Sequence, residues 1–352
     1  MFNENFDMKN TTHIHMAFTL CMMLTVTSCE HSPAVNSHGH LQQWPETSEH
    51  SYVQYVERFS SPTELGIEKG TWNRFVEFFT GSVTHKIVRP MDIAVDNEGT
   101  IYVVDPGISG VHVFNRNKNL YKVLRLKDDA PLPSPVSISL GLDNQIFVSD
   151  SQLGHVFSFT PGEKHLSPLN LDIHIHQPTG LAYDKILDRL YITDTKMHRI
   201  IAVSSRGRFI REYGVRGANK LEFNYPTYLA VDDEHRLYVT DSLNFRVQIL
   251  DQNGAFISMF GKPGDATGNL SRPKGVSIDS DGHIYIVDGL FNSIQIFNKS
   301  GHLLMPVGER GNDTGQFWLP TGIHIDANDF IYVADSHNQR VQILRYLRRK
   351  PQ

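Results

Sequence analysis

The sequence predicts an all-β protein, and within that class a six-bladed β-propeller whose blades are four-stranded antiparallel sheets. Three observations predict this fold. A segment that opens with proline recurs six times, each copy is followed by further short strand patterns, and 26 Gly and 17 Pro supply turns between the strands. Hydrophobic residues at 40% and charged residues at 20% are typical of a globular chain.

The repeat is defined by its opening segment, as in PTYLAVDDEHRLYVTD and PKGVSIDSDGHIYIVD. Successive opening prolines are separated by 43 to 48 residues, a period typical of propeller blades. The six prolines are Pro90, Pro135, Pro178, Pro226, Pro273 and Pro320. Six copies at nearly constant spacing predict six blades.

Each repeat contains four runs rich in β-branched and aromatic residues, as strands require. In the fourth repeat, LAVD and LYVTD flank a polar turn, RVQILD follows, and FISMFG comes after a Gly-containing turn. Short turns join neighbouring strands in antiparallel fashion. Each repeat is therefore expected to form one blade that buries both faces against its neighbours.

The sixth repeat stops after its third strand, RVQILRYL, so its fourth strand must come from elsewhere in the chain. The alternating segment YVQYVERF, from Tyr52 to Phe59, is assigned as this closing strand. Pairing the two ends of the chain in one blade removes the exposed edges of an open ring. In a competing interpretation, VEFFTG near residue 76 is the closing strand.

About thirty residues separate Phe59 from Pro90, more than the later repeats use, which indicates an insertion. A short helix near residues 71–80 fits, because Trp72, Phe75, Val76 and Phe79 recur with a period of 3.6 residues. Thr71 suits an N-cap and Gly81 a helix C-terminus.

The repeats resemble the NHL repeat. The resemblance rests on the Pro-x-Gly opening, on the strand that ends in Asp, and on the segments LYVTDSLNFRVQIL and IYVADSHNQRVQIL. It covers residues 51–347, which are expected to form one NHL-type propeller, followed by a basic tail at residues 348–352. The combination with WPETSEHSYVQYVERFSSPTELG also resembles a class of bacterial propeller lipoproteins.

The N-terminus has the pattern of an export signal. MAFTLCMMLTVTS, ending at Ser28, is apolar and too short to span a bilayer as a helix, which predicts a signal peptide over residues 1–28. VTSC resembles the lipobox of bacterial lipoproteins, and that resemblance implies a lipid on Cys29; a buried helix that ends in a chance cysteine is the alternative. Residues 29–50 are polar and are expected to form a flexible lipidated tether. In enteric-type sorting an aspartate after the lipidated cysteine retains a lipoprotein at the inner membrane. Glu30 stands at this position, which favours the outer membrane.

Charge and cysteine content exclude several functions. A net charge of −5 argues against a nucleic-acid partner. Cys21 and Cys29 are the only cysteines, so the propeller has no disulfide, thiolate metal site or cysteine nucleophile. No cofactor is expected.

An aspartate ends the second strand of every repeat, and a structural role is predicted for all six. Arg199, Arg246 and Arg340 each follow such an Asp by five residues, which favours a repeated carboxylate–guanidinium contact. The six are Asp105, Asp150, Asp194, Asp241, Asp288 and Asp335.

Ligand-binding candidates cluster around the opening prolines, because in propellers the segments entering the innermost strands share one face with the loops between second and third strands. Function on a symmetric scaffold also requires asymmetry. The residue two after the proline is Gly in three repeats but Asp92, Ser137 or Tyr228 in the others. Two positions later, His324 stands in the sixth repeat where the others have Ala or Ser. The candidates for an anionic or glycan-like ligand are Arg89, His176, Tyr225, Arg272 and Lys274.

The predicted function is that of a lipid-anchored platform in the cell envelope, which binds or scaffolds a protein or polysaccharide partner. The alternative is a metal-dependent lyase or hydrolase with histidine ligands on the channel face, as in the related peptidyl-hydroxyglycine amidating lyases. His174 and His176 could share a metal because alternate strand residues face the same way, but a third ligand shows no diagnostic spacing. No catalytic residue and no metal site are assigned.

Overall fold

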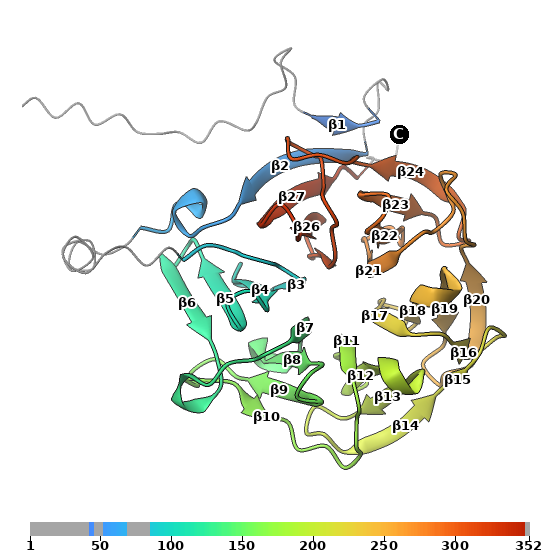
Figure 1. Cartoon of the computed structure of the whole chain (residues 1–352), viewed down its shortest axis with the longest axis horizontal. Coiled ribbons are helices and arrows are strands. Elements are labelled where there is room, and N and C mark those ends of the chain that lie inside the picture. Colours follow the sequence, from blue (N-terminus) through green and yellow to red (C-terminus); the bar gives the residue numbers. More distant parts are fainter. Residues whose placement is uncertain (1–41, 46–51, 69–84, 349–352) are drawn as a thin grey trace, which may run out of the picture. The chain divides into compact units, whose positions relative to one another are not determined.

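The computed structural model describes residues 42–45, 52–68 and 85–348. The predicted fold is confirmed, since six antiparallel sheets stand around a common axis (Figure 1). Outside the described residues lie the signal peptide, Cys29, most of the tether, the expected helix near residues 71–80 and the basic tail beyond Arg348. No helix in the described segments is long and apolar enough to cross a membrane.

The blades are numbered here in chain order of their innermost strands, and each runs outward from the axis. Blade 1 contains β3 (Asp92–Val95), β4 (Ile101–Asp105), β5 (Gly110–Asn115) and β6 (Leu120–Leu124). Blade 2 contains β7 (Pro135–Leu140), β8 (Ile146–Asp150), β9 (His155–Phe159) and β10 (Ser167–Pro168). Blade 3 contains β11 (Pro178–Asp184), β12 (Arg189–Asp194), β13 (Arg199–Val203) and β14 (Phe209–Tyr213).

The second half of the ring continues the pattern. Blade 4 contains β17 (Pro226–Val231), β18 (Leu237–Asp241), β19 (Arg246–Leu250) and β20 (Phe256–Phe260). Blade 5 contains β21 (Pro273–Ile278), β22 (Ile284–Asp288), β23 (Ser293–Phe297) and β24 (Leu303–Val307). Blade 6 contains β25 (Ile323–Ile325), β26 (Phe330–Asp335) and β27 (Arg340–Tyr346) together with strands from the N-terminal part of the chain.

The remaining elements are small. Strands β15 (Val215–Arg216) and β16 (Glu222–Phe223) form a parallel pair on the way into blade 4. The helical turns of the described segments are single 3₁₀ turns, at Thr63–Leu65, Lys127–Asp129, Leu142–Asn144, Thr195–Met197 and Ser242–Asn244.

The closing strand is confirmed as β2 (Val53–Phe59), which pairs antiparallel with β27 from Phe59 opposite Val341 to Val53 opposite Tyr346. The place next to β27 is thus taken, and the interpretation of VEFFTG as the closing strand is wrong. Blade 6 also has a fifth strand, β1 (Gln43–Trp44), which pairs with β2. The tether expected over residues 29–50 therefore includes a structured piece, because the Trp44 side chain is buried in the core.

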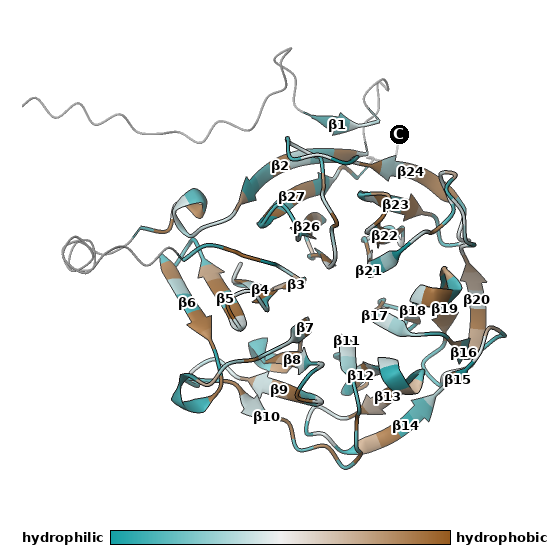
Figure 2. Cartoon of the chain, in the orientation of Figure 1, coloured by the Kyte–Doolittle hydropathy of each residue, from teal (hydrophilic) through white to brown (hydrophobic). Residues whose placement is uncertain are grey.

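The hydrophobic core is divided among the blade interfaces. Six clusters of buried side chains each join two neighbouring blades, as Val104 of blade 1 and Val148 of blade 2 do. Second strands such as β4, β8 and β22 are buried along their whole length, since both of their faces meet another blade. Figure 2 shows the apolar residues along the strands and mostly hydrophilic residues in the loops.

The innermost strands β3, β7, β11, β17, β21 and β25 contact one another in cyclic order around the axis. In blades 2 to 5 a β-bulge follows the opening proline, for example between Pro226 and Leu229 in blade 4. Bulges redirect side chains locally. Here the bulge falls at the position where the sequence carries Ser137, Tyr228 or glycine.

Candidate functional site

One face of the ring brings together the segments that enter the innermost strands and the loops between the second and third strands. The Leu243 amide donates to the Asn224 carbonyl at 3.0 Å in blade 4, and the Gly289 amide donates to the Arg272 carbonyl at 3.0 Å in blade 5. In blade 6 the His337 amide donates to the Trp318 carbonyl. We call this side of the ring, formed by those two sets of segments, the loop face.

The six repeated aspartates are fully buried beneath the loop face. Their carboxylates accept hydrogen bonds from the backbone of the entering segments and, in several blades, of the loop that follows the second strand. In blade 5, for example, Asp288 accepts from the amides of Ser271 (2.7 Å), Arg272 (3.0 Å) and Leu290 (3.1 Å). A buried carboxylate whose oxygens are occupied by amides ties loops together.

In three blades an arginine completes this contact. Arg246 Nε lies 2.8 Å from Asp241 Oδ2, and Arg340 Nε lies 2.7 Å from Asp335 Oδ2. Arg199 Nη2 lies 3.2 Å from Asp194. The five-residue spacing seen in the sequence therefore corresponds to a contact between the ends of paired strands.

Blade 1 departs from this arrangement. His112 Nε2 lies 3.2 Å from Asp105 Oδ2, and its Nδ1 lies 2.9 Å from the Tyr121 hydroxyl. Although burial opposes it, hydrogen bonds from His112 and from backbone amides lower the pKa of Asp105. His112 is almost completely buried, so these contacts connect strands rather than face a ligand.

The structure places three of the predicted ligand-binding residues at the same position in different blades. Arg89, Tyr225 and Arg272 each stand directly before an opening proline, in blades 1, 4 and 5, and all three are exposed. Lys274 lies two residues beyond Arg272, inside β21. These four belong to the segments that surround the channel mouth on the loop face.

His176 stands two residues before its opening proline. Its amide donates to Asp194, and its ring lies 4.6 Å from that of His174. The Tyr225 amide donates to His198 Nδ1 at 3.2 Å, and the two rings stack edge to face. Among the described residues, no group of three His, Cys, Asp or Glu side chains could hold a metal ion.

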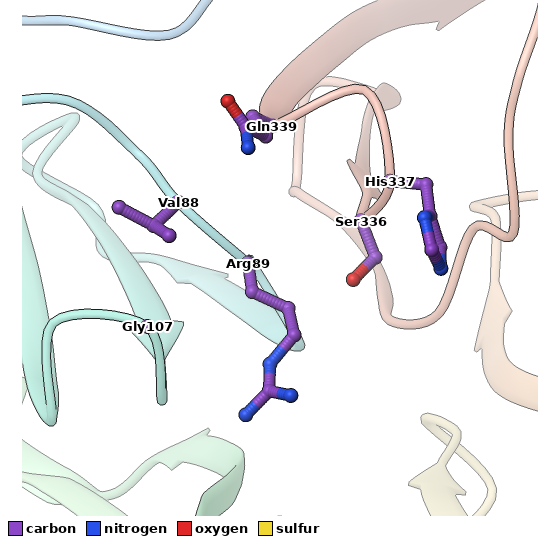
Figure 3. A pocket seen from close by; sticks show the side chains of 6 residues that line it. All are labelled: Val88, Arg89, Gly107, Ser336, His337 and Gln339. Carbon is purple, nitrogen blue, oxygen red and sulfur yellow. The ribbon is translucent and has the colours of Figure 1, made fainter.

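A pocket of about 450 Å³ lies on the loop face between blades 1 and 6. In Figure 3, Arg89 lies on one side of the pocket, in the segment that leads into β3. Ser336 and His337 lie on the other side, in the loop between β26 and β27. Val88, Gly107 and Gln339 complete the lining. A guanidinium, an imidazole, a hydroxyl and an amide around one hollow suit an anionic or strongly polar group.

Sequence reasoning identified Arg89 but not the residues of blade 6 that share its pocket. The available signal was the loop sequence SHNQ after Asp335, which differs from SLNF after Asp241 at two positions. That signal is weak, because every loop of this kind varies.

Side chains of the innermost strands fill the middle of the channel. Tyr228 reaches from blade 4 to the Met91 carbonyl of blade 1, with an O···O distance of 3.2 Å. Asp92 accepts a 2.6 Å hydrogen bond from the Ser137 hydroxyl, and burial raises its pKa to about 7. Beneath Asp92 and Tyr228 lies a cavity of about 240 Å³, to which His324 contributes. The departures from sixfold symmetry noted in the sequence thus line the axis.

Exposed apolar side chains also gather on the loop face. Seven of them are at least 40% exposed and lie either in a segment that leads into an innermost strand or in a loop between second and third strands. They are Val88, Leu153, Met197, Tyr225, Leu243, Leu290 and Trp318. We call these seven residues the apolar ring.

Comparison with known proteins identifies the family. Residues 116–317, more than half of the chain, match the Teneurin NHL domain. The chain belongs to this family. Residues 317–344 match a further NHL repeat, so the two matches together cover blades 2 to 5, part of blade 1 and the inner three strands of blade 6. A search of curated proteins finds no match.

Several solved structures share the propeller fold with this member of the Teneurin NHL domain family. Virginiamycin B lyase from Staphylococcus aureus has a TM-score of 0.56 at 16% identity over 75% of this chain and 97% of its own. A Bacteroides thetaiotaomicron protein of unknown function has a TM-score of 0.58 at 15% identity, covering 75% and 71%. A nidogen/laminin complex matches with a TM-score of 0.52 at 18% identity, covering 72% and 87%. At these identities the likeness concerns the fold alone.

Proposed function

We propose that the protein is an exported, lipid-anchored propeller that binds a protein or polysaccharide partner of the cell envelope through its loop face. The observation that carries this proposal is the apolar ring, which exposes seven large side chains on one side of a repeat scaffold. Exposed apolar clusters rimmed by polar residues are typical of interaction sites.

Charge on the same face supports a partner with anionic groups. Arg89, Arg272 and Lys274 surround the channel mouth, whereas the chain as a whole carries a net charge of −5. A local cationic patch on an acidic protein attracts anionic ligands and orients them during encounter. The apolar ring would then supply most of the binding free energy, and the cations the selectivity.

The anchor is proposed from the N-terminal sequence. Cys29→Ala should leave an uncleaved precursor without lipid, because the proposed lipid is attached to the sulfur atom of this cysteine. Incorporation of labelled fatty acid, followed by gel electrophoresis, measures this. Cys21→Ala is the matched control and should be processed normally; normal labelling of Cys29→Ala would contradict the anchor.

The loop face is tested by placing charge in the apolar ring. Leu243 and Leu290 are 52% and 53% exposed, so Leu243→Asp/Leu290→Asp should leave the fold intact. We expect recovery of the partner from solubilised envelope to fall at least tenfold, because a carboxylate in an apolar contact must be desolvated without a counter-charge.

The control variant lies on the opposite side of the ring. Ile186, in the turn between β11 and β12, is 80% exposed, and Ile186→Asp should leave recovery unchanged. Melting temperatures of both variants within a few degrees of the wild type would show that folding is preserved. Equal loss in both variants, or no loss in the first, would contradict binding through the loop face.

A further inference from the structure

The pocket of about 450 Å³ lies where the ring closes, between blades 1 and 6, and blade 1 has a small residue there. The position two residues after the repeated aspartate carries glycine in blade 1 alone, as Gly107. A Cβ on Gly107 would lie 2.6 Å from the Val88 side chain, so Gly107 contributes only backbone to the pocket wall. The other five blades carry a longer side chain at this position: Gln152, Lys196, Leu243, Leu290 and His337.

One buried carboxylate fixes the blade 1 side of the pocket. Asp105 accepts hydrogen bonds from the Val88 amide at 2.7 Å and from the Arg89 amide at 3.0 Å. It also accepts one from the Gly107 amide at 2.7 Å. Three of the six residues that line the pocket are thus held by one side chain. A ligand would find this wall already in place, which lowers the cost of binding.

Contacts of the loop between β26 and β27 fix the opposite side. The His337 amide donates to the Trp318 carbonyl at 3.1 Å, and the two rings stack with their centroids 5.2 Å apart. The Gln339 amide donates to the Ser336 carbonyl at 3.2 Å. These contacts use backbone groups and ring faces. Within the described segments, the ring nitrogens of His337 and the side-chain amide of Gln339 have no hydrogen-bond partner.

The serine that follows the repeated aspartate of blade 6, Ser336, lacks the contact that its counterparts make. In blade 3, Thr195 donates to the carbonyl of Pro226 in the next blade at 2.6 Å. In blade 4, Ser242 donates in the same way to the carbonyl of Pro273 at 3.1 Å. Both acceptors are opening prolines, so a hydroxyl at this position ties one blade to the next.

At the closure between blades 6 and 1 another residue makes this contact. The Pro90 carbonyl accepts a hydrogen bond from the Thr321 hydroxyl at 3.2 Å. Ser336 is only 6% exposed and lines the pocket, and its hydroxyl forms no hydrogen bond with any described residue. Buried hydroxyls normally have a partner. A ligand in the pocket would supply one.

The Arg89 guanidinium is a cation without an acidic partner. Its side chain is exposed at the pocket, across from Ser336 (Figure 3). It forms no ion pair and no side-chain hydrogen bond in the part of the chain that the structure describes. A guanidinium can bind both oxygens of a carboxylate through two parallel N–H donors. A carboxylate is therefore the group that best complements this side of the pocket.

The size and mixed polarity of the pocket favour an acidic sugar over the side chain of an acidic protein. Its volume of about 450 Å³ is in the range of sites that enclose small molecules, about 300–1,000 Å³. A hydroxyl, a neutral imidazole and an amide each donate and accept hydrogen bonds, as the hydroxyl groups of a sugar also do. Aspartate and glutamate carry no hydroxyl groups and would leave these partners unpaired.

We propose that this pocket binds one uronic acid residue, with its carboxylate on Arg89 and its hydroxyl groups on Ser336, His337 and Gln339. The proposal rests on the proposed function, because the sugar would belong to the polysaccharide that covers the loop face. It also selects a polysaccharide rather than a protein as the partner.

Calorimetric titration of the full chain, purified in detergent at low ionic strength, tests the ligand. The probes are glucuronate and galacturonate, their neutral counterparts glucose and galactose, and glutamate as a carboxylate without a sugar ring. We expect at least one uronate to bind with millimolar affinity. The matching neutral hexose should bind at least tenfold more weakly, because it lacks the charge that pairs with Arg89, and glutamate should not bind.

Two variants test the residues. Arg89→Gln should weaken uronate binding at least tenfold, because it removes the cation from an exposed position. Ser336→Ala should weaken it several-fold by removing one hydrogen bond, without lowering the melting temperature, because the hydroxyl has no partner within the described chain. Arg208→Gln is the matched control, since Arg208 is an exposed arginine in the turn between β13 and β14, on the opposite side of the ring.

Four results would overturn the proposal. They are no binding of either uronate, equal binding of the neutral hexose or of glutamate, uronate binding by Arg89→Gln or Ser336→Ala as tight as that of the wild type, and a loss in Arg208→Gln as large as that in Arg89→Gln.

Failure here is separable from failure of the proposed function, because Leu243 and Leu290 belong to blades 4 and 5, away from the pocket. If the partner requires the apolar ring but neither uronate binds, the sugar subsite is wrong and the platform stands. If a uronate binds through Arg89 but charge in the apolar ring leaves partner recovery unchanged, the subsite stands and docking of a partner through the apolar ring is wrong.

Discussion

A chain shortened to begin at Ser60, which lacks β1 and β2, is expected to lose the cooperative thermal unfolding of the propeller. Val53, Tyr55 and Phe59 of the closing strand are almost completely buried and contribute to two interface clusters. Loss of each large buried side chain costs about 2–5 kcal/mol. Together these losses approach the whole stability of a typical domain, about 5–15 kcal/mol.

Removal of β2 would also expose the edge of β27, which normally pairs over the register from Phe59–Val341 to Val53–Tyr346. Unpaired edges promote aggregation. Calorimetry and near-ultraviolet circular dichroism measure the loss. A chain that begins at Ser51 and lacks only β1 is the control, and it should retain a cooperative transition. A transition of the Ser60 chain within a few degrees of the control would contradict the closure argument.

Asp92 should make the stability of the propeller fall as the pH rises from about 4 to about 7. Burial raises the pKa of this carboxyl to about 7 in the folded protein, whereas hydrogen bonds from Ser137, Ile138 and Ile93 oppose the shift. In the unfolded chain Asp92 ionises near pH 3.8. Above that pH the unfolded state loses its proton before the folded state does, so the free energy of unfolding falls. The stabilisation is therefore fully present below pH 3.8 and lost once the pH exceeds about 7.

Asp92→Asn removes this titration and leaves other groups in place. The difference in unfolding free energy between the variant and the wild type should shift in favour of the variant by up to about 4 kcal/mol between pH 4 and pH 7. Urea denaturation at several pH values measures it. A difference that stays constant with pH would mean that Asp92 ionises normally in the folded state.

The regular part of the fold was predictable because it is encoded locally and six times over. The opening prolines, the turns and the alternating strands give the blades, and YVQYVERF alternates clearly enough to identify β2 as the closing strand. The strand β1 was not predictable. Its two residues lie in a polar segment with no period, and they join the blade through pairing with β2 and through packing of Trp44 in the core, where Gly315 leaves room for the indole ring.

Positions around the channel were predictable, but contacts across it were not. The distance of Arg89, Tyr225 and Arg272 from their prolines placed them on the rim. The pocket of Arg89 includes residues about 250 positions later in the chain, because the ring closes there. The hydrogen bond from Tyr228 to the Met91 carbonyl likewise joins blades that face each other across the axis, which single repeats do not reveal.

Site-specific photo-crosslinking in intact cells tests the central claim, binding of a partner through the loop face, most directly. A benzophenone amino acid replaces Leu243 in one strain and Ile186 in another, since both side chains are exposed and lie on opposite sides of the ring. We predict a discrete crosslinked adduct from position 243 and none from position 186. Adducts from position 186 alone, or none from either position, would contradict the claim.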